Sequence, residues 1–205
     1  MIDTSTGEKV RPVWERAASE ALQTRGRGDL AWKRNELRGG IDVIGEHYAV
    51  PHLAPLMAEC QGRQQQQQRD AIVRAAAITA INDHCPQKSF PRQGSDQPVR
   101  PYRLGHAMRA LTRQRTGQKP SAKPAKRDSV AKRLALLPEM DFDSAVDTIS
   151  ALISFANSER ISVNFYDLAE TLFFWGQGLT DNSVRVRNRV LSDYYGATDA
   201  PRKAI

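Results

Sequence analysis

The segment between Phe142 and Ala156 carries the most regular apolar pattern in the chain. Its apolar residues are Phe142, Val146, Ile149, Ile153 and Ala156, at steps of four, three, four and three residues. This spacing places all five on one side of an α-helix. A helix with such a side must cover it with other parts of the chain. The segment therefore predicts a helix that is packed on one side.

Helical spacing recurs along most of the chain, and no stretch alternates apolar and polar residues over the length of a strand. Further helices are predicted at Pro12 to Thr24, Asp29 to Arg38, Ile41 to Tyr48, Asp70 to Asp83, and around Leu104, Leu134, Leu168 and Val186. We therefore predict an all-α fold of two small helical bundles joined by a loop, with about eight to nine helices. The bundles are expected at residues 1–85 and 102–205, the loop at 86–101, and a basic insert at 116–127.

Short polar residues stand before several predicted helices, where a side-chain oxygen can accept a hydrogen bond from a free backbone N–H. The expected capping residues are Asp29, Asp128 or Ser129, and Asp141 or Asp143, and the last helix is expected to begin at Thr180 or Asn182. Because capping accounts for Asp141, we do not interpret it and Asp143 as a catalytic acid and base.

Two segments before residue 80 are less regular. Pro51 and Pro55 predict a turn followed by another helix through about Ala58. The five glutamines from Gln64 to Gln68 favour either an extension of the next helix or an exposed loop.

Basic residues are concentrated in the middle of the chain. Residues 86–133 contain thirteen Lys or Arg and two Asp, a net charge of +11, whereas the whole chain carries +7. Cations at this density are typical of a surface that binds an anionic polymer such as nucleic acid. A solvated linker remains an alternative, because Pro, Gly and Ser interrupt the segment.

The predicted nucleic-acid-binding residues come from this segment and from a smaller basic group near residue 30. They are Arg25, Arg27, Lys33, Arg34, Arg38, Arg103, Arg109, Arg113, Arg115, Lys119, Lys126, Arg127, Lys132 and Arg133. The apolar stripe from Leu104 to Leu111 leaves several of these cations on the opposite side of its helix. Packing of that stripe would hold them at the surface.

The sequence contains no recognisable motif for catalysis. A glycine-rich phosphate loop, a His-Glu-x-x-His motif and a Gly-x-Ser-x-Gly elbow are all absent. The four histidines and two cysteines lack the spacing of a shared metal site. We therefore expect no enzyme activity, no cofactor, no metal and no small-molecule substrate.

The expected location is the cytoplasm. No apolar run reaches the length of about 18 residues that a membrane helix requires, and residues 1–11 lack the apolar core of a secretory signal. Cys60 and Cys85 fit inert thiols in a reducing compartment. The late aromatic residues have helical spacing that favours the core or a protein interface over base stacking. They are Phe165, Tyr166, Phe173, Phe174, Trp175, Tyr194 and Tyr195.

Several short patterns follow one another along the chain. They are Trp14, Gly28-Asp29 with Lys33-Arg34, Leu104-Gly105 with Leu111, Ser129 with Lys132 and Leu137, Asn164-Phe165 with Leu168, Leu172 and Trp175, Val186-Arg187, and Tyr194-Tyr195. In this order the chain resembles the small subunit (CasB-type) of the type I-E CRISPR surveillance complex Cascade. It departs from that family's pattern at Asn164-Phe165 in place of Asp-Trp, at the longer insert from Gln118 to Lys126, and at Ser150 and Ala151, where members often carry arginines.

The resemblance implies a non-catalytic subunit of a guide-RNA ribonucleoprotein, present as a pair of copies that pack head to tail. The implied partners are other Cascade proteins, the guide RNA and the target DNA with its displaced strand. The subunit would hold the unwound DNA as an R-loop without sequence specificity. Only Lys33, Arg34 and Lys132 match the family by position, and the other basic residues rest on charge clustering.

A function of another class stays open on the sequence alone. A helical protein-interaction adaptor would use the same basic segment to dock acidic partners. The two hypotheses differ in whether the isolated chain binds DNA or RNA at moderate salt.

Overall fold

A computed structural model describes residues 11–87, 102–123, 126–178 and 180–196 of the chain. These ranges form nine α-helices and no strand, which confirms the predicted all-α class. The helices are α1 (Val13–Leu22), α2 (Ala31–Gly39), α3 (Glu46–Ala58), α4 (Gln65–Ile81), α5 (Leu104–Thr116), α6 (Ser129–Leu136), α7 (Phe142–Ser158), α8 (Phe165–Trp175) and α9 (Asp181–Tyr195). Two 3₁₀ segments, Gly28–Leu30 and Leu137–Glu139, precede α2 and follow α6.

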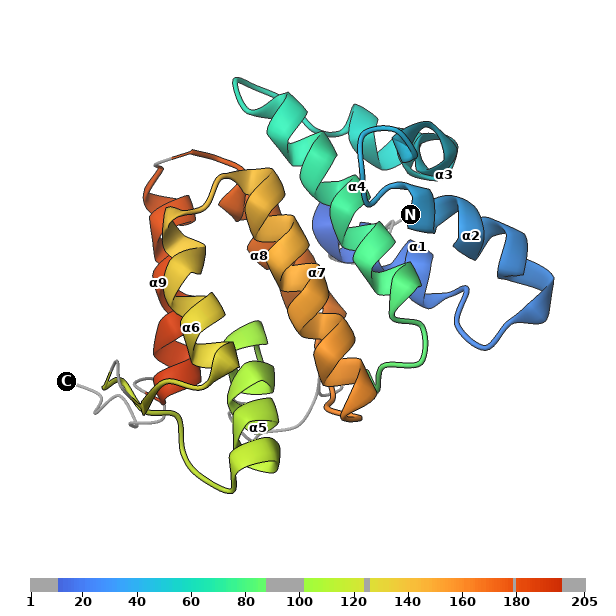
Figure 1. Cartoon of the computed structure of the whole chain (residues 1–205). Coiled ribbons are helices and arrows are strands. Elements are labelled where there is room, and N and C mark those ends of the chain that lie inside the picture. Colours follow the sequence, from blue (N-terminus) through green and yellow to red (C-terminus); the bar gives the residue numbers. More distant parts are fainter. Residues whose placement is uncertain (1–10, 88–101, 124–125, 179, 197–205) are drawn as a thin grey trace, which may run out of the picture.

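The helices lie in two groups that share α8. Figure 1 shows α1 to α4 on one side of the molecule, α5, α6 and α9 on the other, and α7 and α8 between them. Helix α8 packs against α1 and α4 from the first half of the chain and against α9 from the second. The division into two bundles stays a prediction, and most of the proposed loop at 86–101 falls outside the described residues.

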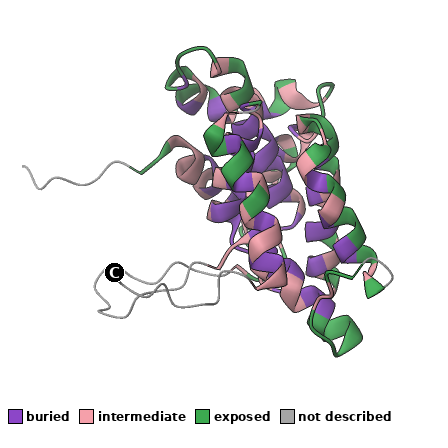
Figure 2. Cartoon of the chain, turned by 90° about the vertical axis from the view of Figure 1, so that its left-hand side faces the viewer, coloured by how far each residue is buried: buried purple, intermediate pink, exposed green. Residues whose placement is uncertain are grey.

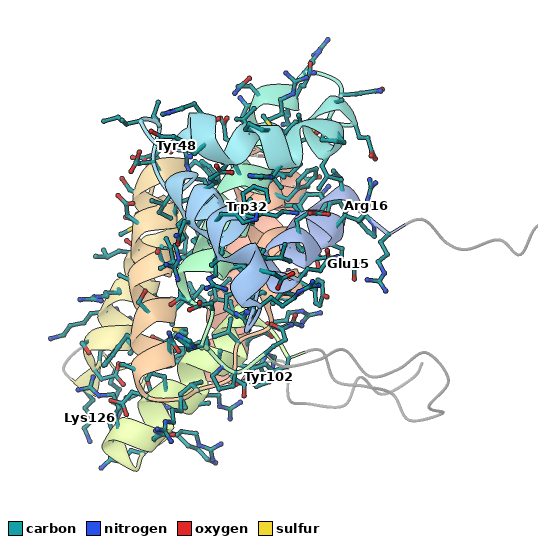
Figure 3. The ribbon with its side chains drawn as sticks, turned by 90° about the vertical axis from the view of Figure 1, so that its right-hand side faces the viewer. Glu15, Arg16, Trp32, Tyr48, Tyr102 and Lys126 are labelled. Atoms are coloured by element: carbon teal, nitrogen blue, oxygen red, sulfur yellow. The ribbon has the colours of Figure 1, made fainter. Side chains whose placement is uncertain are left out.

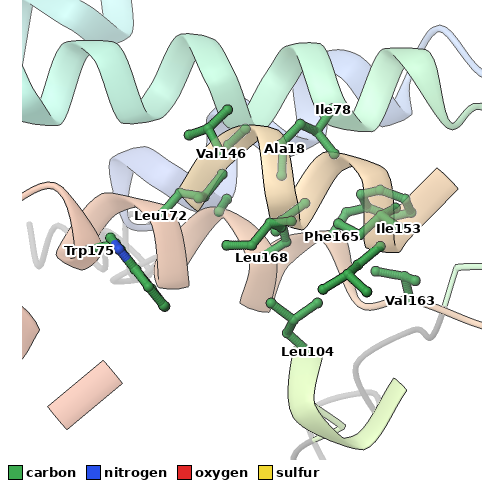
Figure 4. Packing of buried hydrophobic residues seen from close by; sticks show 14 of the residues in the cluster. Ala18, Ile78, Leu104, Val146, Ile153, Val163, Phe165, Leu168, Leu172 and Trp175 are labelled. Carbon is green, nitrogen blue, oxygen red and sulfur yellow. The ribbon is translucent and has the colours of Figure 1, made fainter. Parts of the chain in front are cut away.

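Buried apolar residues from both halves form one connected core. Figure 4 shows Ala18 of α1 and Ile78 of α4 beside Leu168 and Leu172 of α8. In Figure 2 the buried residues run through the centre of the helices, with exposed residues on the outer sides. A core of this kind explains why Val146, Ile149, Ile153 and Ala156 of the α7 stripe are buried.

The late aromatic residues belong mainly to this core. Trp175, Phe165 and Tyr194 are among the largest fully buried side chains. Trp14 of α1 contacts Phe173 of α8, with ring centroids 4.8 Å apart. The prediction that these aromatic residues serve packing is confirmed for the buried members of the group.

Helices α6, α7 and α9 begin where the sequence predicts. Asp128, Asp141 and Thr180 accept hydrogen bonds from the backbone N–H groups of Ala131, Ser144 and Ser183, at 2.7, 2.8 and 3.3 Å. The prediction for Asp29 is wrong: Leu30 holds the position before α2, and no side chain caps that helix. The 3₁₀ turn places Asp29 one residue too early, and its carboxylate binds Arg27 instead at 2.7 Å.

The predicted turn at Pro51 and Pro55 is also wrong, because both prolines lie inside α3. A proline within a helix removes one backbone hydrogen bond. Both prolines are exposed, so the carbonyl groups that lose a partner can be solvated. Of the two alternatives for the glutamine run, the structure shows the helix, since α4 begins at Gln65.

Candidate nucleic-acid interface

Three of the five predicted cations in the first half of the chain bind the end of α4. Arg25 donates hydrogen bonds to the carbonyl oxygens of Asn82 and Cys85, both at 2.9 Å. Arg34 and Arg38 lie 3.1 and 3.4 Å from Asp83, whose side chain is only 8% exposed. These contacts place positive groups at the negative end of the α4 dipole. They hold α2 and the turn after α1 against α4.

The other two predicted cations in this half pair with nearby carboxylates. Lys33 Nζ lies 2.6 Å from Glu20 of α1, and Arg27 lies 2.7 Å from Asp29. Since five predicted cations have partners within the fold, their charge is partly neutralised before any other molecule approaches. A role in nucleic-acid binding for Lys33 and Arg34 stays a prediction.

Arg103 and Arg109, at the start and middle of α5, face the end of α9. The guanidinium of Arg103 lies 3.7 Å from both Asp167 of α8 and Asp193 of α9. The guanidinium of Arg109 lies against Gly196, where an added Cβ would meet its Nη1 at 2.7 Å. Both arginines therefore help to join α5 to its neighbours.

Asp167 is a buried carboxyl at the centre of this junction. It accepts a hydrogen bond from the Leu104 backbone N–H at 3.0 Å and lies 3.8 Å from Arg189. Burial raises the pKa of Asp167 to about 7, although Arg189 and the Leu104 N–H both act to lower it. The cluster thus fixes the first turn of α5. Because α5 is a continuous helix, the position of its last turn is fixed as well.

The remaining predicted cations lie together in a different environment. We call this group the cationic end; it comprises Arg113, Arg115, Lys119, Lys123, Lys126, Arg127, Lys132 and Arg133. All of them are exposed except Arg127, which is half-buried. Lys123 belongs to the basic segment of the sequence but was not among the predicted binding residues. The only acidic residue between positions 113 and 133 is Asp128, whose carboxylate caps α6.

Local structure explains why these cations reach the surface. Helix α5 ends at Gly117, which has a φ of 66°, and Arg113 and Arg115 occupy its last turn. Cations are favoured there by the helix dipole. Helix α6 buries Val130 and Leu134, so that Lys132 and Arg133 face solvent. In Figure 1, α5 and α6 lie at the end of the molecule away from α2 and α3, and Figure 3 shows Lys126 far from Trp32 and Tyr48.

A pocket of about 350 Å³ is lined by cations from both helices, Arg115 of α5 and Arg133 of α6. Its lining residues are Arg115, Ser129, Val130, Arg133, Leu152 and Phe155. The Arg115 guanidinium lies 4.5 Å from the centre of the Phe155 ring and 3.8 Å from Glu159. The lining of the pocket therefore combines two positively charged side chains with three apolar ones.

The neighbouring surfaces are less suited to a polyanion. Helix α7 contains no Lys or Arg, and its exposed side carries Asp143, Asp147 and Ala151. A second cavity of about 520 Å³ includes Glu46, Asp70 and Asp143 in its lining, and its one arginine pairs with Glu46 at 3.2 Å. These carboxylates would repel phosphate groups. The cationic end is therefore the candidate nucleic-acid interface.

Besides Lys123, Phe155 is a residue of the site that sequence analysis missed. It stands beside the α7 stripe, and no local pattern indicates that it contacts an arginine of α5. The contact depends on how α5 and α7 pack, so only the tertiary structure could find it.

The described residues show little sign of other chemistry. Within them, no group of three or more His, Cys, Asp or Glu side chains is placed to hold a metal ion. Both cysteines are free and buried, and burial raises the pKa of the Cys85 thiol to about 11, which keeps it protonated near neutral pH. No helix in the described ranges combines the length and the apolar character needed to cross a bilayer.

Comparison with known proteins gives matches to one family. The family model described as CRISPR-associated protein Cse2 matches residues 33–195. A crystal structure of a Cse2-family protein from Thermus thermophilus is similar with a TM-score of 0.60 and 21% identity, covering 89% of this chain and 97% of that one. A CasB structure from Thermobifida fusca has a TM-score of 0.59 and 13% identity, covering 91% and 99%. No curated protein sequence matches the chain.

Proposed function

The chain belongs to the family of CRISPR-associated protein Cse2, and from this premise we propose that it binds nucleic-acid backbone as part of a CRISPR-guided ribonucleoprotein. Family membership supports a structural role as the CasB-type small subunit of Cascade. In this role the subunit catalyses no reaction of its own. It holds unwound target DNA, including the displaced strand, without reading its sequence.

The observation that carries the proposal is the contrast between the two groups of cations. The basic residues near α2 and at the start of α5 have carboxylate or carbonyl partners inside the fold. The cationic end has eight cations and a single carboxylate between residues 113 and 133. Among its described side chains, only Arg115 has an ion pair with a carboxylate from another part of the fold, Glu159 at 3.8 Å. A strand of phosphates would neutralise these charges and release counterions. Scattered cations without a base-reading helix suit contacts with phosphate, which position a strand without specifying its sequence.

The proposed protein partners are other Cascade subunits, with a second copy of this chain among them. The first half of the chain offers exposed apolar side chains, chiefly Trp32, Val43, Ile44 and Tyr48. Such groups are more typical of protein contacts than of contacts with phosphate. They lie on α2, on α3 and between them, away from the cationic end.

The test replaces three members of the cationic end and measures binding to single-stranded DNA by fluorescence anisotropy. The variant carries Arg113→Gln, Lys132→Gln and Arg133→Gln. We expect its Kd to rise about tenfold or more, because three phosphate contacts are lost.

A matched control carries Arg11→Gln, Arg63→Gln and Arg185→Gln, three exposed cations outside the cationic end. It has the same net charge as the test variant, so it should retain most of the affinity if position matters. Equal losses in both variants would mean that net charge alone drives binding. Unchanged affinity in the test variant would show that the interface lies elsewhere.

A further inference from the structure

The pocket between α5, α6 and α7 has a composition that phosphate binding does not explain. Its apolar lining residues are Val130 and Leu152, which are 2% and 0% exposed, and the half-buried Phe155. A phosphate group is recognised by charge and hydrogen bonds, so apolar lining residues would not contribute to its binding. The volume, about 350 Å³, lies near the lower limit of ordinary small-ligand pockets, about 300 to 1,000 Å³. The site therefore suits a small group with both apolar and anionic parts.

Arg115 is held in place beside this pocket. The guanidinium carbon of Arg115 lies over the Phe155 ring, 4.5 Å from its centre, and Glu159 lies 3.8 Å from Arg115 Nε. Gln114, next along α5, donates a hydrogen bond to the Glu159 carbonyl oxygen at 2.9 Å and ties the two helices together. The Arg115 side chain remains 43% exposed. A guanidinium that is held by an aromatic ring and a carboxylate and is still partly exposed is a suitable platform for a flat ring.

We propose that this pocket takes one unstacked nucleobase of a single strand. The nucleobase stacks on the exposed part of the Arg115 guanidinium beside Phe155, while the exposed Arg133 and Ser129 hydroxyl meet the adjoining phosphate. A duplex keeps its bases stacked and cannot offer one in this way. The inference rests on the proposed function, and it adds that the cationic end distinguishes single strands from duplexes by more than charge.

The experiment compares a thymidine oligomer with an abasic oligomer of equal length, which has the same phosphates and no bases. Wild-type protein should bind the thymidine oligomer about five- to a hundredfold more tightly, the range expected for one stacked base. Ser129→Leu fills the pocket without changing charge, and it should remove this preference. Ser154→Leu, at an exposed position of α7 outside the pocket, is the matched control and should behave as wild type.

A second variant, Phe155→Leu, keeps an apolar side chain but removes the ring that supports Arg115. It should also reduce the preference for bases, and helical circular dichroism will show that each variant is folded. The proposal that the pocket binds a nucleobase would be overturned if the wild type bound both oligomers with equal affinity. It would also be overturned if Ser129→Leu and Phe155→Leu kept the preference for thymidine. Neither result would affect the proposal of backbone binding. Binding of neither oligomer would overturn both proposals.

Discussion

A methyl group added at Gly105 should separate α5 from α9. A Cβ at this position would lie 2.3 Å from the Val190 carbonyl oxygen, 2.7 Å from Asp193 Cβ and 2.9 Å from the Tyr194 backbone nitrogen. Two of these atoms are backbone and cannot move without displacing α9. Gly105→Ala gains about 1 kcal/mol of helix propensity. The forced overlap costs about 1 to 3 kcal/mol in an ordinary core and more where backbone must move.

We therefore expect Gly105→Ala to lower the free energy of unfolding by about 1 to 2 kcal/mol. In a chain of this size the Tm should fall by about 2 to 8 °C. Urea denaturation followed by circular dichroism gives both quantities. Gly28→Ala is the matched control, because no atom lies within 4 Å of the added Cβ, and its stability should stay the same or rise by up to about 1 kcal/mol. If Gly105→Ala is as stable as the wild type, α5 does not approach α9 as closely as described.

Two further predictions concern the supports of the cationic end. The pKa of Asp167 is raised in the folded state to about 7 from 3.8, so its contribution to stability is greatest below about pH 4 and is lost as the pH rises towards 7. This loss of stability has an upper limit of about 4 kcal/mol. Asp167→Asn keeps an oxygen that can accept from the Leu104 N–H but does not titrate. The variant's free energy of unfolding should therefore lack this dependence on pH. Asp128→Ala should destabilise the protein by about 1 kcal/mol, because the cap of α6 is lost; unchanged urea midpoints would contradict this.

The sequence predicts most of the helices because their patterns are local. The helix predicted at Ile41 to Tyr48 is an exception, since residues 41–45 form turns and α3 begins at Glu46. The stripe of α7 and the caps at Asp128, Asp141 and Thr180 depend on residues within one or two turns. The errors at Asp29 and Pro51 arise where the same local rules allow two outcomes. A capping residue can lie one position away from the helix start, and an exposed proline can remain inside a helix.

The candidate site is less predictable because charge counts do not reveal ion pairs. Arg34 and Asp83 come from distant parts of the sequence, as do Arg103 and Asp193, and only the fold brings each pair together. The sequence therefore identifies the basic residues but cannot separate those that join helices from those that face solvent. The pocket beside Phe155 depends on three helices at once, and for that reason no linear pattern indicates it.

The salt dependence of single-strand binding tests most directly whether the cationic end binds phosphate groups. For about five phosphate contacts the log of the binding constant should fall with the log of salt concentration at a slope of about −3.5. The variant with Arg113→Gln, Lys132→Gln and Arg133→Gln should have a slope shallower by about 2. A flat response in the wild-type protein would contradict the account and favour an adaptor that binds acidic proteins. An identical slope in the variant would contradict it too, because the phosphate contacts would then lie outside the cationic end.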